Sequence, residues 1–247
     1  MTGTFDPPLR LDQALVALGL ADSRARAAEM IRAGAVNVDG QTVLRASAKV
    51  GRQKVAVTGE TNPWVSRAAL KLVHALDRFM LSPQGARAVD VGASTGGFTE
   101  VLIARGAAHV IAVDVGRGQL HPKLRDHPKI DLREGVNARD MDQAILGHPD
   151  WVVSDVSFIS ATKALGPALA AAREGATLVT LVKPQFELTP QDIGKGGIVK
   201  DEGLRRKALD DVSAWVEAQG WGLLGTTESP VPGSDGNVEW LIAATKL

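Results

Sequence analysis

Four charged residues stand where the sequence pattern places the ends or faces of helices and strands. They are Lys71, Asp155, Lys183 and Glu239. Lys183 follows an otherwise apolar run, and such a lysine is hard to explain as structure because lysines are rarely buried without a partner. Amines and carboxylates can move a proton or stabilise charge that develops during a reaction. Side chains of these types at the ends of helices and strands are therefore candidates for a catalytic site.

A glycine-rich stretch, Val89-Asp-Val-Gly-Ala-Ser-Thr-Gly-Gly-Phe98, follows the first apolar run of this region. Its glycines allow a ligand to approach the backbone closely. Ser94 stands where a dinucleotide-binding loop needs its second glycine, and the Gly-Lys-Ser/Thr of a P-loop is missing. The next apolar run ends at Asp114, whose carboxylate can accept two ribose hydroxyls. Acids at Asp90 and Asp114 suit a cationic nucleoside better than a phosphate.

Alternating helices and strands must position these residues. Helices are predicted over 66–80, 96–105, 118–125, 160–173 and 201–219. Strands are predicted over 86–91, 109–113, 130–134, 151–154, 177–182, 221–228 and 237–243. Apolar strands alternating with helices predict an α/β fold whose parallel sheet is covered on both faces. The last two strands form a hairpin that adds an antiparallel strand, and ligands of such sheets bind at the carboxyl ends of the strands.

Residues 1–59 form a separate predicted module, in which basic residues outnumber acidic ones although the whole chain is neutral. Helices are predicted over 11–20 and 25–33, and Asp22 or Ser23 can cap the second. Two strands surround the Asp39-Gly40 turn, and another covers 54–58. A polar stretch ending at Pro63 marks a boundary. The predicted domains are 1–59, a linker over 60–65, and 66–247.

Composition excludes several classes of protein. The 247 residues are 45% hydrophobic and 23% charged, which is typical of a globular chain. The absence of cysteine excludes disulfides, cysteine-ligated zinc and a cysteine nucleophile. The N-terminus lacks the pattern of a signal peptide, and the apolar runs are too short to span a bilayer. A soluble, cytoplasmic protein without a membrane partner is expected.

The first module resembles the small RNA-binding domain named after ribosomal small-subunit protein S-four. The matching stretches are Arg10-Leu-Asp, Ser23-Arg-Ala-Arg-Ala-Ala and Ile31-Arg-Ala-Gly-Ala-Val-Asn-Val-Asp-Gly40. The resemblance covers residues 9–58 and implies that the second helix and the loop after it face RNA. It makes four arginines candidate RNA contacts: Arg10, Arg24, Arg26 and Arg32.

The larger region resembles the S-adenosylmethionine-dependent methyltransferases, through Asp-x-Gly-x-x-x-Gly-Gly and the acid that ends the second strand. The resemblance implies a Rossmann-like, mostly parallel seven-stranded sheet, S-adenosylmethionine as cofactor and no metal. It places Asn137 and Arg139 near the adenine. The residues expected to bind the cofactor are Asp90, Gly92, Ala93, Ser94, Thr95, Gly96, Gly97, Phe98, Asp114, Asn137 and Asp155.

The residue pattern restricts the atom that is methylated. The Asn/Asp-Pro-Pro-aromatic motif of amino-group methyltransferases is replaced by Ser154-Asp-Val-Ser-Phe-Ile-Ser160, and methylation at pyrimidine carbon 5 needs a cysteine. An oxygen remains, or with less support a ring nitrogen. The Lys-Asp-Lys-Glu order resembles the FtsJ (RrmJ) group of RNA ribose 2′-O-methyltransferases. The resemblance implies that Lys183 orients and deprotonates the hydroxyl.

Two roles remain open for Lys183. A free lysine has a pKa of about 10.4, which burial lowers and neighbouring carboxylates raise. Asp155 and Glu239 would favour the ammonium, whereas Lys71 would oppose it. The side chain is therefore either a general base or an electrostatic clamp on the developing oxyanion.

Residues 9–247 as a whole resemble the TlyA (hemolysin A) family. Further matches are Val182–Glu187, Gly194-Lys-Gly-Gly-Ile-Val-Lys200 and Ser229-Pro-Val-Pro-Gly233 leading to Gly236-Asn237. Ala68-Ala69 departs from the Gly-Gly expected before Lys71, and the added methyl groups could shift the helix that carries this lysine. The resemblance implies 2′-O-methylation of cytidine in ribosomal RNA, with the RNA or a ribosomal subunit as partner. The sequence does not determine the oligomeric state, and a monomer is the default expectation. The alternatives are a non-catalytic ribosome-assembly factor and a membrane-active hemolysin.

Overall fold

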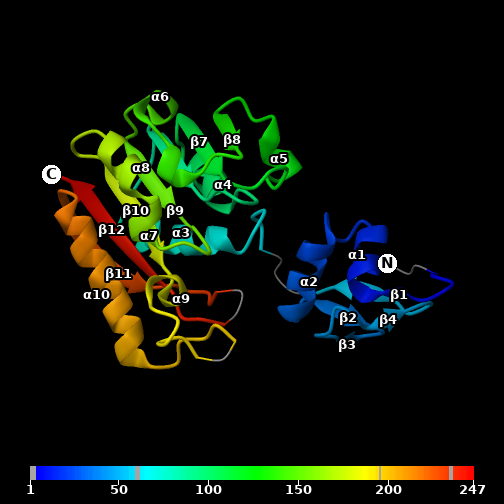
Figure 1. The fold of residues 1–247 in the computed structure, drawn as a ribbon. Helices are drawn as coiled ribbons and strands as arrows, with labels where there is room; N and C mark the ends of the chain where they lie inside the picture. Colours follow the sequence, from blue (N-terminus) through cyan, green and yellow to red (C-terminus); the bar gives the residue numbers. More distant parts are fainter. Residues whose placement is uncertain (1–3, 59–61, 195, 234–235) are drawn as a thin grey trace. The chain divides into compact units, whose positions relative to one another are not determined.

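The computed structural model describes residues 4–58, 62–194, 196–233 and 236–247. The chain divides into two compact units, Met1–Pro63 and Trp64–Leu247 (Figure 1). This division falls within the predicted linker 60–65, of which residues 60 and 61 lie outside the described part of the chain. Each unit has its own buried apolar cluster.

The first unit packs two helices against short strands. Ser23 caps α2 (Arg24–Arg32) by accepting a hydrogen bond from the backbone N–H of Arg26, as predicted. Asp39 and Gly40 have positive φ angles and form the predicted turn of a hairpin. The other elements are α1 (Leu11–Ala17), β1 (Leu9–Arg10), β2 (Val36–Val38), β3 (Gln41–Thr42), β4 (Lys49–Val50) and β5 (Val55–Val57). β2 lies between β3 and β5, and β1 pairs with β4.

A seven-stranded sheet organises the second unit, in the order β11-β12-β10-β9-β6-β7-β8. Its strands are β6 (Arg87–Val91), β7 (His109–Asp114), β8 (Ile130–Glu134), β9 (Trp151–Ser154), β10 (Thr177–Val182), β11 (Trp221–Glu228) and β12 (Trp240–Lys246). The neighbours from β10 to β8 are parallel, and β12 runs antiparallel to both β10 and β11. The predicted parallel sheet with a closing hairpin is confirmed.

Helices cover both faces of this sheet (Figure 1). On one face, α3 (Ala68–Arg78) and α4 (Gly97–Ala104) pack on side chains such as Val153. On the other, α7 (Ala161–Ala164), α8 (Gly166–Ala171) and α10 (Glu202–Ala218) pack on side chains such as Val152. Burial on both faces explains why the central strands are continuously apolar. The remaining short elements are α5 (Pro122–Arg125), α6 (Gln143–Leu146), α9 (Pro184–Glu187) and the 3₁₀ turn η1 (Ala138–Asp140).

Three predicted elements differ in the structure. Of the helix predicted over 118–125, only Pro122–Arg125 is helical. The predicted helix over 160–173 is two helices, because Pro167 lacks the N–H that would continue one ladder. The predicted strand over 237–243 begins only at Trp240, so Glu239 precedes the strand instead of lying in it. The Asn237 side chain accepts a hydrogen bond from the backbone N–H of Val199 and donates one to the backbone carbonyl of Gly197. Residues 237–239 therefore form a loop before the strand.

Candidate active site

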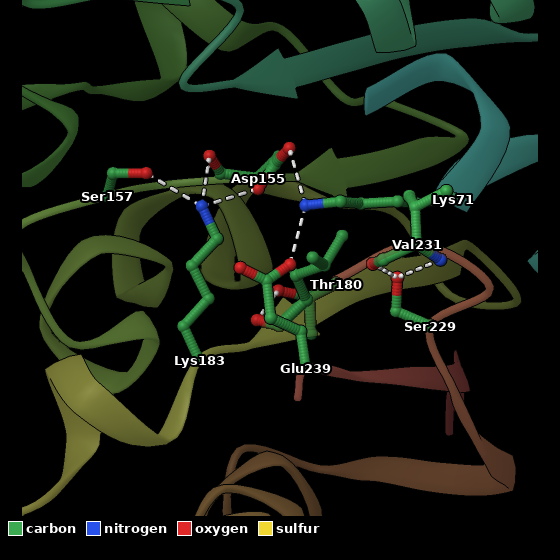
Figure 2. A network of polar contacts seen from close by, with 9 residues as sticks. Lys71, Asp155, Ser157, Thr180, Lys183, Ser229, Val231 and Glu239 are labelled. Carbon is green, nitrogen blue, oxygen red and sulfur yellow. Dashed lines mark hydrogen bonds and ion pairs between the residues drawn. The ribbon is translucent and has the colours of Figure 1, made fainter. Parts of the chain in front are cut away.

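The four predicted catalytic residues meet at the carboxyl ends of the central strands. Asp155 directly follows β9, and Lys183 directly follows β10. Lys183 Nζ lies 2.6 Å from Asp155 Oδ1, and Lys71 Nζ lies 3.8 Å from Asp155 Oδ2 and 2.5 Å from Glu239 Oε2. The two lysines reach Asp155 from opposite sides (Figure 2). Charges therefore alternate in the order Lys183, Asp155, Lys71, Glu239.

Burial makes this alternation significant. The exposed fraction is 7% for Lys71, 7% for Lys183 and 2% for Glu239. A buried charge is costly unless it is paired, and removal of one partner leaves the other uncompensated. The four residues are therefore interdependent, although they come from elements far apart in the sequence.

Lys183 has three acceptors around its amine. Besides Asp155 Oδ1, it donates to Ser157 Oγ at 2.7 Å and to the Asp155 backbone carbonyl at 3.4 Å. An ammonium has three N–H donors, and the 3.4 Å contact is long, so a substrate hydroxyl can take the place of the Asp155 carbonyl. The arrangement suits a charged amine that clamps developing negative charge. The sequence pattern did not single out Ser157, although it stands two residues after Asp155.

The departure at Ala68-Ala69 is accommodated by a glycine of the loop. A side chain at Gly97 would collide with Ser66 Oγ and press on the Ala69 backbone and Ala68 Cβ. Gly97 therefore allows α4 to pack closely on the start of α3 even with two alanines there. Lys71 keeps its contact with Glu239 in this arrangement.

The glycine-rich loop fixes the acid at the end of β7. Ser94 N donates to Asp114 Oδ2, and Gly116 N donates to Asp114 Oδ1, both at 2.7 Å. Ser94 itself has a φ of 47° and Gly92 a φ of 85°. A side chain at Gly92 would press on Val156, so that glycine also brings the loop after β9 close to β6. Each Asp114 oxygen has a further lone pair for a ligand hydroxyl.

Asp90 occupies a different environment from Asp114. Its side chain is fully buried, and Oδ2 accepts a hydrogen bond from Thr99 Oγ1 at 2.6 Å. Among the described residues, no group is hydrogen-bonded to its Oδ1. Burial raises the pKa of Asp90 to about 7, with the nearby Asp155 and Asp114 carboxylates acting in the same direction. An orphaned buried carboxylate oxygen of this kind is compatible with a cationic ligand close by.

A cavity of about 480 Å³ opens beside these strand ends. Of the residues predicted to bind the cofactor, it is lined by Gly92, Ser94, Asp114, Asn137 and Asp155. The other predicted residues do not line it: Phe98 is buried in the core, and a side chain at Gly96 would meet Leu120 and Leu124. Ala93 and Gly97 are also buried, and so is Asp90, whereas Thr95 is exposed.

The cavity has further walls that the sequence pattern did not indicate. Asn137 accepts hydrogen bonds from Arg139 at its edge. Apolar and polar side chains from three loops complete the lining; they are Val113, Val115, Gln119, Val136, Ala138, Val156, Ser157, Phe158 and Ile159. Most of these residues lie in the segments that follow a predicted strand, and this position is the signal that could have identified them. In the part of the chain that the structure describes, no cluster of metal-ligating side chains occurs.

The predicted RNA contacts of the first unit differ in availability. Arg10 and Arg24 are both paired with the buried Asp12, and the Arg10 hydrogen bond lowers the pKa of that carboxyl. Arg24 and Arg32 are exposed. The Arg26 side chain is only 18% exposed, and it contacts Glu29 and donates to the backbone carbonyl of Asn62. Arg24 and Arg32 are therefore better placed than Arg26 to meet a phosphate.

Comparison with known proteins identifies the family. Residues 64–246 match the model of the FtsJ-like methyltransferases, and residues 9–55 match the S4 domain. TlyA of Mycobacterium tuberculosis, named as a 16S/23S rRNA (cytidine-2′-O)-methyltransferase, is 45% identical over 94% of this chain and 88% of its own length. The chain belongs to the TlyA family of FtsJ-like methyltransferases.

Other members of the TlyA family support this result. Hemolysin A of Brachyspira hyodysenteriae is 37% identical over 94% of this chain and 98% of its own length. A solved structure from Streptococcus thermophilus, whose protein is named as a hemolysin, is 36% identical in sequence. Its TM-score is 0.78, and the match covers 97% of this chain and 88% of the Streptococcus thermophilus chain. The predicted family and the predicted fold class are confirmed. Within residues 4–58, 62–194, 196–233 and 236–247, no helix is long and apolar enough to cross a membrane.

Proposed function

We propose that this protein transfers a methyl group from S-adenosylmethionine to the 2′-hydroxyl of a cytidine ribose in ribosomal RNA. The observation that carries the proposal is the buried Lys183, which contacts two residues that line the cavity, Asp155 and Ser157. The names of relatives such as TlyA of Mycobacterium tuberculosis support ribosomal RNA and cytidine as the substrate.

The cavity suits S-adenosylmethionine, which supplies an electrophilic methyl group when bound. Asp114 would accept the ribose hydroxyls, since both of its oxygens are held in place by backbone N–H groups. Asn137, Val115 and Val136 line the cavity and would border the adenine. Asp155, which lines the cavity, would place negative charge near a sulfonium.

A ribose hydroxyl becomes a good nucleophile only as its proton leaves. Lys183 would orient the hydroxyl and stabilise the oxyanion that develops during attack. Asp155 holds the Lys183 amine in place, and Lys71 and Glu239 balance the charge of Asp155 on its other side. The hydroxyl proton would pass to water, because a charged Lys183 amine already carries three protons and has no lone pair to accept it.

Two units of different chemistry divide the work. The S4-type unit carries exposed arginines that suit RNA phosphates, and the FtsJ-like unit carries the cavity and the tetrad. We infer that the first unit recognises ribosomal RNA or a ribosomal subunit and the second performs the transfer.

The decisive experiment locates the transferred methyl group. The full chain is incubated with labelled S-adenosylmethionine and ribosomal subunits, and the modified RNA is hydrolysed in alkali. A 2′-O-methyl blocks cleavage at that ribose, so one resistant dinucleotide containing cytidine is expected. A label on a base would contradict the proposed reaction, and RNA binding without any transfer would favour a non-catalytic assembly factor. Lys183→Ala serves as the inactive control.

A further inference from the structure

The loop between β9 and α7 carries two residues that contact Lys183, and it is strained. Phe158 has a φ of 65°, and its side chain is 92% exposed. A bulky residue rarely adopts a positive φ, and such a conformation persists only when the surrounding structure holds it. Something must therefore hold residues 155–160 in place.

Two anchors flank Phe158. On one side, Asp155 and Ser157 contact the amine of Lys183. On the other, the carboxylate of Glu187 accepts hydrogen bonds from Ser160 Oγ at 2.5 Å and from the backbone N–H of Ala161 at 2.8 Å. The strained residue thus lies between two fixed ends.

Both anchors belong to the same helical turn. Lys183 is the residue immediately before α9, and Glu187 is the last residue of α9, so this short helix links the two anchors. The Phe186 ring of the same turn lies 5.3 Å from the Phe158 ring. The loop is therefore held along its length by α9, and a change at Glu187 reaches the contacts of Lys183.

Glu187 is not explained by the tetrad itself. Its carboxyl is partly buried, and burial raises its pKa, whereas the hydrogen bonds from Ser160 and Ala161 and the charge of Lys163 oppose that rise. Its hydrogen bonds go to the start of α7, on the far side of the loop from Lys183. Ser160 already caps α7, because its hydroxyl accepts a hydrogen bond from the backbone N–H of Thr162. Glu187 is therefore not needed for the cap.

We propose that Glu187 is a positioning residue, which holds the 155–160 loop in the strained conformation that brings Asp155 and Ser157 to Lys183. The inference rests on the proposed methyl transfer. Loss of Glu187 should lower the rate of the chemical step by a larger factor than it lowers affinity for the cofactor. The loop also lines the cavity, but the contacts that depend most on its placement are those of Asp155 and Ser157 with Lys183.

The test compares Glu187→Ala and Glu187→Gln with Asp142→Ala. Asp142 caps α6 through the backbone N–H of Ile145 and so matches the loss of a cap away from the tetrad. The assay is single-turnover methyl transfer by the full chain on ribosomal subunits. Glu187→Ala should lower the rate about 10–100-fold, the usual effect of misplacing a reacting group. Its affinity for S-adenosylmethionine, measured by calorimetry, should fall by a smaller factor than the rate.

Glu187→Gln should recover most of the rate. Its amide oxygen can accept from the Ala161 N–H, and its amide nitrogen can donate to Ser160 Oγ. Hydrogen exchange gives a readout independent of activity: amides of residues 155–161 should exchange faster in Glu187→Ala, and those residues should be unchanged in Asp142→Ala. If Glu187→Ala does not fold, Ser160→Ala, which removes one of the two contacts, provides the same comparison.

Three results would overturn the inference. They are a normal single-turnover rate in Glu187→Ala, a Glu187→Gln enzyme no faster than Glu187→Ala, and a rate loss in Asp142→Ala equal to that of Glu187→Ala. Failure of the proposed function is a separate result, because the wild-type enzyme would then transfer no methyl group to ribosomal RNA.

Discussion

Among single residues, Lys183 is the one on which the chemistry most depends. Lys183→Ala should slow single-turnover methyl transfer about 10²–10⁴-fold, the range for a positioned catalytic group. Asp155→Ala should be similarly damaging, because it removes the 2.6 Å contact that holds Lys183. The losses should not add in the double variant, since the tetrad acts as a unit. Affinity for the cofactor measured by calorimetry should change little in Lys183→Ala, and a near-normal rate would contradict its role.

Asp90 should make stability depend on pH. Its pKa is raised to about 7 by burial, above about 3.9 for an unfolded aspartate, so the folded protein prefers the protonated form. The contribution of protonated Asp90 to the free energy of unfolding is fully present below about pH 4, and it is lost as the pH rises through about 7. Asp90→Asn keeps an acceptor for Thr99 and removes the charge. Urea denaturation of the ligand-free wild-type protein and of Asp90→Asn should be compared at pH 5 and pH 8.5. The increase in the free energy of unfolding caused by Asp90→Asn should be larger at pH 8.5. A gain independent of pH would contradict the assignment.

Among the elements, α8 depends on a lysine at the end of β12. Lys246 Nζ donates to the backbone carbonyls of Leu169, Ala170 and Ala172, which the end of the helix leaves without partners. Lys246→Met keeps the apolar stem but removes all three hydrogen bonds. It should lower the free energy of unfolding by about 1–3 kcal/mol. Urea denaturation measures this, with Lys207→Met as the control, because Lys207 forms only an exposed pair with Asp211. Equal stability of the two variants would contradict the expected cap.

At the scale of the whole molecule, RNA binding should depend on the positive charge of the first unit. Removing that charge should not change cofactor binding in the cavity of the second unit. Replacing Arg24 and Arg32 by glutamine should weaken RNA binding and flatten its dependence on salt, since each lost phosphate contact removes about 0.7–0.9 from the logarithmic slope. Filter binding at several salt concentrations measures this, with Arg105→Gln of the second unit as the control. Cofactor affinity should remain unchanged. An unaltered salt slope would show that these arginines do not contact phosphate.

Local sequence determined much of this protein. The apolar runs identified the central strands, because a strand buried on both faces must be apolar throughout. Residue type limited the cap of α2 to Asp22 or Ser23, and Ser23 is the one that caps it. The order of the four charged residues, and the end of a strand at Asp155 and at Lys183, also follow from the amino-acid pattern alone. These features depend on neighbours a few residues away.

The tertiary structure decided what depends on distant partners. Asp90 and Asp114 are the same residue type in similar positions, yet burial separates their environments. Arg26 is turned inward by contacts that its helix pattern does not reveal. The strain at Phe158 and the two contacts of Glu187 arise only when α9 packs on the loop after β9. Burial, close approach and loop conformation are set by residues far apart in the chain, and for that reason no local pattern contains them.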